Sequence, residues 1–270
     1  MSATYAITGA SGSLGWAFLK NISKDPNNVV IALVRNKVGT EKRVSEELSD
    51  RKNIHVVEAD LTNYESIKKS ADQVSTITGG SLDYLIANAG FVTRWSGNLP
   101  MTVIAETPQE LEENLLDTYR INVIGQVHLF NLYIPLILKG NVKKVITLGT
   151  GLADPELTAK YKLELAGPYS LSKAATNLLV AKYHASYADQ GVLFLSLSPG
   201  FVESGHQDNL TEQEIPYVQK MVASFIEYAP QFQKFSPEQS VEYMMKVVYN
   251  ATVEKYGGAA VSHNGDGKWL

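Results

Sequence analysis

Residues 8–15 read Thr8-Gly9-Ala10-Ser11-Gly12-Ser13-Leu14-Gly15 and join an apolar run, Thr4–Thr8, to a helix-like segment, Ser13–Ser23. Glycine permits a tight turn and lets backbone amides come close to a pyrophosphate, whose charge the N-terminus of the next helix attracts. A purely structural turn would contain glycines too. The position at the first strand–helix junction nevertheless favours a phosphate-binding turn.

Short apolar runs alternate with helix-like segments along the chain. The runs are rich in β-branched residues and apolar on both faces, which is typical of strands buried in a parallel sheet. We therefore predict one domain over residues 1–270, an α/β fold with a single doubly wound Rossmann-type parallel sheet of about seven strands and helices on both faces. The clearest runs are Tyr5–Ile7, Val29–Val34, Ile54–Val57, Leu82–Ala87, Val145–Leu148 and Val192–Leu197.

Longer polar-and-apolar segments between these runs predict helices at Tyr64–Ile77, from Thr107 to about Leu138, and from Pro168 through Ala188. Two segments break the alternation: residues 91–106 after the fourth run and residues 201–236 after the sixth. Ligands of open parallel sheets bind beyond the carboxyl ends of the strands. Since both segments leave from those ends, we expect them to surround a ligand, with 201–236 as the substrate loop region.

The composition excludes several classes of protein. The chain has no cysteine, so it forms neither disulfides nor thiolate metal sites. Its formal net charge is −4 and no run of Lys and Arg stands out, so we expect neither nucleic acid nor a membrane as a partner. The histidines show no metal-binding spacing, and no metal is expected. No signal segment or bilayer-length apolar stretch is evident, so a cytoplasmic location is expected.

The second apolar run ends at Val34 and passes into Arg35-Asn36. Enzymes that use NAD usually carry an acidic residue near this point, which binds the ribose 2′-hydroxyl. A guanidinium instead suits the 2′-phosphate of NADP(H) through charge-assisted hydrogen bonds. The alternative is a solvated surface arginine. We favour NADP(H) as the cofactor.

Six motifs occur in order between Thr4 and about Val261, and in this order they resemble the short-chain dehydrogenase/reductase family. The resemblance implies an NADP(H)-dependent oxidoreductase of the carbonyl reductase type. The motifs are the turn at residues 8–15, Asp60, Asn88-Ala89-Gly90, Asn122, the pair Tyr169 and Lys173, and Pro199-Gly200.

The same resemblance implies a set of cofactor-binding residues. It assigns Asp60 to the adenine, and Pro199 to Ser204 to the nicotinamide carboxamide, with backbone atoms from Val202 and a serine at 204 where threonine is more usual. Asn88-Ala89-Gly90 is expected to support the sheet and face the cofactor. The implied set is Gly9, Ser11, Gly12, Ser13, Leu14, Gly15, Arg35, Asn36, Asp60, Leu61, Asn88, Ala89, Gly90, Tyr169, Lys173, Pro199, Gly200, Val202 and Ser204.

Tyr169 and Lys173 stand four residues apart, which places them on one face of a helix. Tyrosine titrates near pH 10, so acid–base work near neutrality requires a lower pKa, which a neighbouring ammonium and an oxidised nicotinamide would favour. Tyr169 would then protonate a carbonyl oxygen as hydride arrives from NADPH. The resemblance gives Lys173 a hydrogen bond to the ribose and Asn122 a water in a proton relay. The alternative is an ordinary surface pair.

Two departures from the family pattern stand out. Ser13 occupies the place of the family's second glycine, with Gly12 one position earlier, which puts the phosphate geometry in doubt. The usual catalytic serine is absent, and by strand position Thr150 takes its place as the residue that orients the substrate. The spacing from Thr150 to Tyr169 is nineteen residues, so an insertion around Asp154–Leu165 is implied. A structural threonine in a weakened site is the alternative.

The substrate region is rich in aromatic residues. Four of its residues recur at helical spacing: Tyr217, Met221, Phe225 and Tyr228. This spacing predicts either a helix packed on the core or a lid over a hydrophobic substrate. Phe91, Trp95 and Met101 are expected to line the opposite wall. We predict a hydrophobic ketone or aldehyde and its alcohol as the substrate pair.

Three further readings of the sequence remain. The resemblance implies pairing through the helices at about 108–138 and 168–188, so a homodimer or homotetramer is expected. Ser170-Leu171-Ser172-Lys173 also matches a serine hydrolase pattern, but its partner motifs are absent. A non-redox cofactor-binding regulator, or an isomerase or cyclase using the same pocket, stays as the alternative function.

Overall fold

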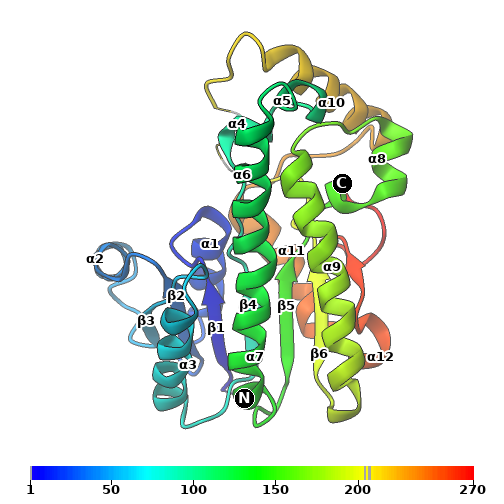
Figure 1. Ribbon diagram of the computed structural model, residues 1–270. Coiled ribbons are helices and arrows are strands. Elements are labelled where there is room, and N and C mark those ends of the chain that lie inside the picture. The colour runs from blue at the N-terminus through cyan, green and yellow to red at the C-terminus, as the bar shows by residue number, and fades with distance from the viewer. Residues whose placement is uncertain (1, 204, 206–207) are drawn as a thin grey trace.

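Seven parallel strands form one sheet in this computed structural model, which describes residues 2–203, 205 and 208–270. The strand order is β3-β2-β1-β4-β5-β6-β7, so the chain reverses its direction of winding between β1 and β4 (Figure 1). This arrangement confirms the predicted doubly wound sheet. The strands are β1 (Thr4–Thr8), β2 (Val29–Val34), β3 (Ile54–Glu58), β4 (Tyr84–Ala87), β5 (Lys144–Leu148), β6 (Leu193–Leu197) and β7 (Ala260–Val261).

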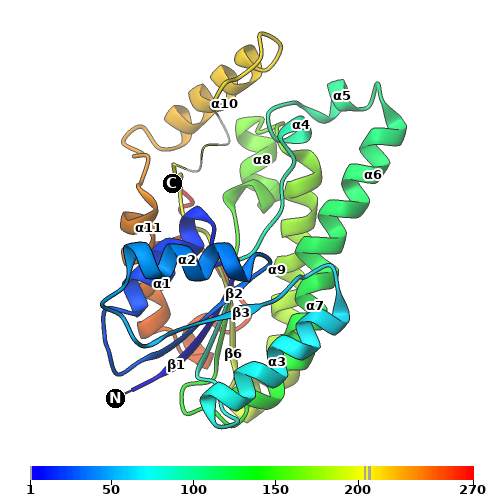
Figure 2. The same cartoon turned by 90° about the vertical axis from the view of Figure 1, so that its left-hand side faces the viewer.

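Helices cover both faces of the sheet (Figure 2). The principal ones are α1 (Ser13–Ile22), α2 (Lys37–Glu47), α3 (Tyr64–Thr78), α6 (Pro108–Tyr119), α7 (Gly125–Ile137), α9 (Gly167–Tyr187), α10 (Ile215–Tyr228) and α11 (Pro237–Asn250). Short helical elements are α4 (Arg94–Gly97), α5 (Met101–Ile104), η1 (Arg120–Ile124), η2 (Gly151–Ala153), α8 (Pro155–Tyr161), η3 (Ala188–Gln190) and α12 (Val253–Tyr256).

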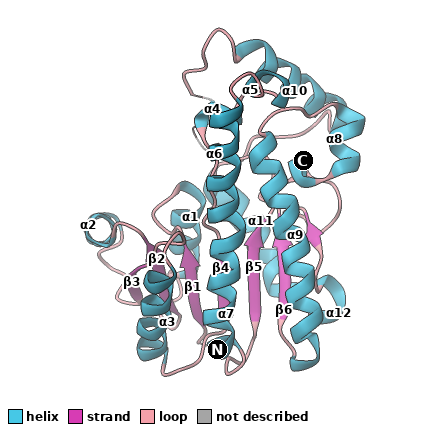
Figure 3. Ribbon diagram, viewed as in Figure 1, coloured by secondary structure: helices cyan, strands magenta, loops and turns pink. Residues whose placement is uncertain are grey.

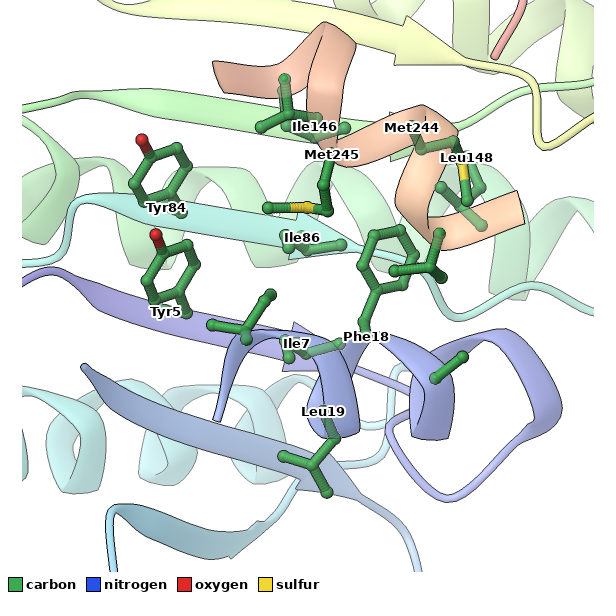
Figure 4. Packing of buried hydrophobic residues seen from close by; sticks show 14 of the residues in the cluster. Tyr5, Ile7, Phe18, Leu19, Tyr84, Ile86, Ile146, Leu148, Met244 and Met245 are labelled. Carbon is green, nitrogen blue, oxygen red and sulfur yellow. The ribbon is translucent and has the colours of Figure 1, made fainter. Parts of the chain in front are cut away.

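Each central strand contributes alternate side chains to two separate cores. Ile7 and Ile86 pack with Phe18 of α1 and Met244 of α11 on one face (Figure 4). Leu85, the neighbour of Ile86 in β4, faces the second core, which lies beneath α3, α7 and α9. Because both faces of every central strand are buried, apolar residues dominate both, which explains the mostly apolar runs. Thr147 of β5 and Ser196 of β6 are buried polar exceptions. The runs end where the strands reach the upper edge of the sheet.

The predicted long helix from Thr107 to Leu138 is one continuous rod, α6–η1–α7, with a π-helical turn at Arg120–Ile124. The predicted helix from Pro168 is α9, with Pro168 in its first turn. Neither α2 nor α11 was predicted from the sequence. Asn36, which was predicted to bind the cofactor, caps α2, its side chain accepting a hydrogen bond from the Gly39 amide at 2.9 Å.

The segments that interrupt the strand–helix alternation gather beyond the carboxyl ends of the strands (Figure 3). Residues 91–106 contain α4 and α5, and the implied insertion around Asp154–Leu165 contains α8, which follows η2. The substrate loop region contains α10, which confirms the helical spacing read from its aromatic residues. These elements lie beyond the carboxyl ends of β1 and β4, the two strands between which the direction of winding reverses. They therefore enclose the place where ligands of such sheets bind.

Candidate active site

The turn after β1 depends on two glycines. Gly9 has a φ of +64°, a conformation that side-chain-bearing residues rarely adopt. At Gly15, a Cβ would lie 2.1 Å from the Gly9 carbonyl oxygen and 2.8 Å from the Ala10 Cα, so no side chain fits there. Gly12 caps α1 and Ser13 is its first residue, with no positive φ. Serine therefore replaces the family's glycine at Ser13 without backbone strain.

The turn after β4 is tied to the end of β1. The Asn88 side-chain amide donates to the Thr8 carbonyl oxygen at 2.9 Å, and the Ala89 amide donates to the Thr8 hydroxyl at the same distance. A Cβ at Gly90 would lie 3.3 Å from the Lys173 Nζ. The two turns thus form a floor of backbone between β1 and β4, without side chains that would fill it.

A groove follows this floor across the carboxyl ends of the strands. It is lined by sixteen of the residues expected at the cofactor: Gly9, Ser11, Gly12, Ser13, Leu14, Gly15, Arg35, Asn36, Asp60, Leu61, Asn88, Ala89, Gly90, Tyr169, Lys173 and Pro199. Extra Cβ atoms would fill the space above this floor, and a helix N-terminus lies next to it. The groove therefore fits a dinucleotide. Gly200 instead lines the neighbouring cavity, and Val202 lines neither hollow. Ser204 lies outside the described residues.

Two arginines stand at the outer end of the groove. Arg35 is exposed and forms no ion pair within the described part of the chain. Arg43 was missed in the sequence, because nothing local links α2 to the glycine turn. Its guanidinium lies 3.9 Å over the Trp16 ring, pairs with Glu47 at 2.8 Å and donates to the Ser11 carbonyl oxygen at 3.2 Å. Arg43 therefore joins α2 to the glycine turn with its charge paired, while Arg35 contributes a cation to the lining of the groove.

Tyr169 lies where the groove meets a second cavity and lines both. Lys173, one turn further along α9, is buried, and its Nζ donates to the Leu148 carbonyl oxygen at 2.9 Å. The Nζ lies 5.7 Å from the centre of the Tyr169 ring. The structure thus brings the predicted pair together at the junction of the two hollows.

Burial controls the protonation of this pair. It raises the pKa of Tyr169 to about 12 and lowers the pKa of Lys173 to about 8, since removal from water disfavours both charged forms. We expected the neighbouring ammonium and an oxidised nicotinamide to favour the phenolate; burial acts on the pKa of the phenol in the opposite direction. Desolvation is the cause of both shifts in pKa.

Asn122 occupies the π-helical turn η1 and is buried. Its amide nitrogen donates to the Phe91 carbonyl oxygen at 2.8 Å and to the Ser172 hydroxyl at 3.0 Å, while its Oδ1 accepts from the Phe91 amide at 2.7 Å. The side chain therefore joins the segment after β4 to α9. The π turn sits at the residue that sequence reasoning assigned to a relay.

The second cavity is mainly apolar and has polar groups at its inner end. Thr150, two residues after the end of β5, lines it together with Tyr169 and Ser198. The Thr150 Oγ1 accepts a hydrogen bond from the Leu152 amide at 3.2 Å, which leaves its proton free to point elsewhere. Ser198 was missed in the sequence, where only its place directly after β6 could have indicated it.

The walls of this cavity differ in part from the expected ones. Met221 and Phe225 of α10 line the cavity, and Phe225 also belongs to a buried apolar cluster. The helix therefore packs against this cluster and covers the cavity. On the opposite side the expected Trp95 and Met101 are absent from the lining, and Phe91 lines the groove instead. That side is formed by neighbours in the same segment: Val92, Thr93, Arg94, Gly97 and Asn98.

A doubly wound sheet, a groove at its reversal point and a lysine–tyrosine pair on an adjoining helix define a Rossmann-type dinucleotide-binding protein. Comparison with known proteins refines this class. The family model for short chain dehydrogenases matches residues 3–215. The chain therefore belongs to the short-chain dehydrogenase/reductase family of oxidoreductases, as the order of its motifs predicted.

Relatives match along the entire length. Short chain dehydrogenase virK of Hypocrea virens is 48% identical over 269 residues, covering 99% of both chains. Short-chain dehydrogenase/reductase AacuF of Aspergillus aculeatus is 46% identical over 270 residues, again covering 99% of both. Among solved structures, the NADPH-bound carbonyl reductase from chicken fatty liver has a TM-score of 0.77 at 22% identity and covers 98% of both chains. These matches fix the family, and the last supports the fold.

Proposed function

We propose that this protein is an NADP(H)-dependent oxidoreductase that interconverts a hydrophobic ketone or aldehyde and the corresponding alcohol. The observation that carries the proposal is the position of Tyr169, which lines both the groove and the apolar cavity. A group at this junction reaches a substrate and a cofactor at once, as an acid–base group in hydride transfer must.

The residues of the groove fit the dinucleotide cofactor of the family. Gly9, Gly15 and Gly90 would allow its backbone contacts, and Arg35, which pairs with no acidic residue in the described ranges, would bind the 2′-phosphate. When bound, the nicotinamide supplies or accepts the hydride, and its oxidised form carries positive charge. That charge, next to Lys173, would offset the desolvation that raises the pKa of Tyr169.

The chain's own residues would then divide the proton chemistry. In the direction of reduction, Tyr169 donates its phenolic proton to the carbonyl oxygen. Thr150 donates a hydrogen bond to the same oxygen and orients it. Lys173 holds a positive charge beside the phenol. Asn122, through its hydrogen bonds to Phe91 and Ser172, holds α9 against the segment after β4. The apolar walls exclude water, which strengthens each of these interactions.

Turnover separates this proposal from a regulator that only senses the cofactor. Purified protein is mixed with NADPH and a panel of hydrophobic ketones and aldehydes, and loss of the reduced-nicotinamide absorbance is recorded. Turnover that Tyr169→Phe abolishes, with NADPH binding retained, supports the oxidoreductase. Tight NADPH binding without turnover across the panel would favour the sensor instead.

We further propose that the protein pairs through the outer surface of α6, η1 and α9. Five large apolar side chains are exposed there: Leu116, Tyr119, Ile124, Leu171 and Leu178. Leu178 is 62% exposed, and such a concentration of apolar surface on adjacent helices is typical of an interface. A homodimer or homotetramer would cover it. No helix in the described part of the chain is long and apolar enough to cross a membrane. A cytoplasmic location remains our expectation.

A further inference from the structure

Trp269 forms one side of the apolar cavity and is held there by direct packing. Its side chain lines the cavity and is 9% exposed. A Cβ at Gly151 would lie 2.6 Å from the Trp269 Cβ and 2.8 Å from its Cγ. The indole therefore rests on a glycine that has no room for a side chain, directly after Thr150.

Two hydrogen bonds hold Trp269, one through its indole and one through its backbone. The Trp269 Nε1 donates to Oδ2 of Asp154 at 2.8 Å, and its backbone amide donates to the Tyr228 hydroxyl of α10 at 3.0 Å. The other oxygen of Asp154 accepts from the Glu156 and Leu157 amides and so caps α8. One carboxylate thus joins the insertion helix to the cavity wall. Figure 1 shows the C-terminal end of the chain beside α8.

The rest of the cavity suits a flat ring. Phe201 and Phe225 line it with their rings edge to face, 5.7 Å between centres, and the Met221 thioether completes this wall. The cavity volume is about 230 Å³. A cavity of roughly 150 Å³ is known to bind benzene, so this one has room for a substituted ring or two small fused rings. Leu157 and Leu163 add apolar lining, while Thr93, Arg94 and Asn98 form the side opposite α10.

We propose that Trp269 is a specificity-determining residue that selects aryl ketones and aldehydes by stacking against their rings, with Asp154 as its positioning residue. This inference rests on the proposed carbonyl chemistry and adds the substrate class. Stacked aromatic pairs contribute beyond simple burial. A planar aryl ketone is therefore favoured over a puckered ring of the same carbon skeleton.

A matched pair of substrates isolates this contribution. Phenyl methyl ketone and cyclohexyl methyl ketone share their carbon count and differ in planarity. In Trp269→Leu, kcat/KM for the phenyl ketone should fall by about 2- to 12-fold more than for the cyclohexyl ketone, the range that aromatic pairing supplies. Trp269→Phe should retain the preference. If Trp269→Leu lowers kcat/KM equally for both ketones, stacking is not the basis of selection. The same conclusion follows if Trp269→Phe loses the preference for the phenyl ketone.

Asp154→Asn tests the positioning role. Asparagine caps a helix as well as aspartate does, so α8 is retained, but the neutral amide is a weaker acceptor for the indole N–H. We expect KM for the phenyl ketone to rise with kcat unchanged, whereas Glu156→Gln, a neighbouring carboxylate that does not touch Trp269, changes neither. An unchanged KM in Asp154→Asn would overturn this part of the inference.

Binding without turnover distinguishes the two proposals. Saturation-transfer NMR measures binding of both ketones to the wild type and to Trp269→Leu, whether or not hydride is transferred. A phenyl preference that disappears in Trp269→Leu supports the stacking wall even if the reductase proposal fails. Turnover of both ketones with no phenyl preference in binding or kinetics refutes the wall and leaves the reductase intact.

Discussion

Replacing Thr150 with valine removes one hydroxyl and keeps the branched shape of the side chain. That hydroxyl has two proposed tasks. It accepts a hydrogen bond from the Leu152 amide at 3.2 Å, and its proton is free for the substrate oxygen. The valine variant tests both at once, and the serine variant at the same position retains both.

The two tasks predict losses of different size. Removing one donor to an oxygen that gains charge in the transition state costs about 10²- to 10³-fold in kcat. Loss of the cap at Leu152 costs about 1 kcal/mol of stability, which lowers Tm by roughly 2–4 °C for a chain of this size. Thr150→Val should therefore show a large kinetic defect with a small stability defect.

Three measurements follow from this. Steady-state rates at saturating NADPH give kcat and KM, thermal unfolding gives Tm, and titration with NADPH gives Kd. Thr150 lines the apolar cavity and not the groove, so Kd for NADPH should stay at its wild-type value. Thr150→Ser should restore the rate, because it restores the hydroxyl.

Wild-type kcat in Thr150→Val would refute the assignment of Thr150. The hydroxyl of Ser198, which lines the same cavity, would then be the remaining candidate for the donor, and Ser198→Ala would show the defect instead.

Four further predictions concern the groove, the acid, the buried lysine and the outer helices. Tyr169→Phe should reduce kcat by at least about 10²-fold while NADPH still binds, because only the proton donor is removed; normal turnover would contradict the assigned acid. Arg35→Asp should weaken binding of NADPH relative to NADH by about 10- to 100-fold, the value of a charged hydrogen bond; an unchanged ratio of the two Kd values argues against a 2′-phosphate contact. Burial lowers the pKa of Lys173 from 10.5 to about 8, so above pH 8 the unfolded chain holds more protons than the folded one and the free energy of unfolding rises with pH. Denaturant titrations should show a rise steeper in the wild type than in Lys173→Met by roughly 1.4 kcal/mol per pH unit up to about pH 10; parallel curves for the two proteins would disprove it. Leu178→Glu should shift the molar mass measured by light scattering toward the monomer, and no shift would exclude this surface as the interface.

The sequence alone determined the parts of this protein that depend on local constraints. Strands buried on both faces are predominantly apolar, which made the central strands recognisable as apolar runs. A tight turn at a strand end demands glycine at Gly9 and Gly15, and helical geometry places Tyr169 and Lys173 on one face. Each of these features involves residues a few positions apart, so the pattern itself contains them.

Tertiary structure alone decided which distant residues meet and how burial changes their chemistry. The hydrogen bond between Asp154 and Trp269 joins residues 115 positions apart, and the contact between Arg43 and Ser11 depends on how α2 packs beside the first turn. The pKa values of Tyr169 and Lys173 follow from desolvation, a property of everything packed around them. No periodicity or spacing records such contacts, because they arise only when separate elements pack together and exclude water.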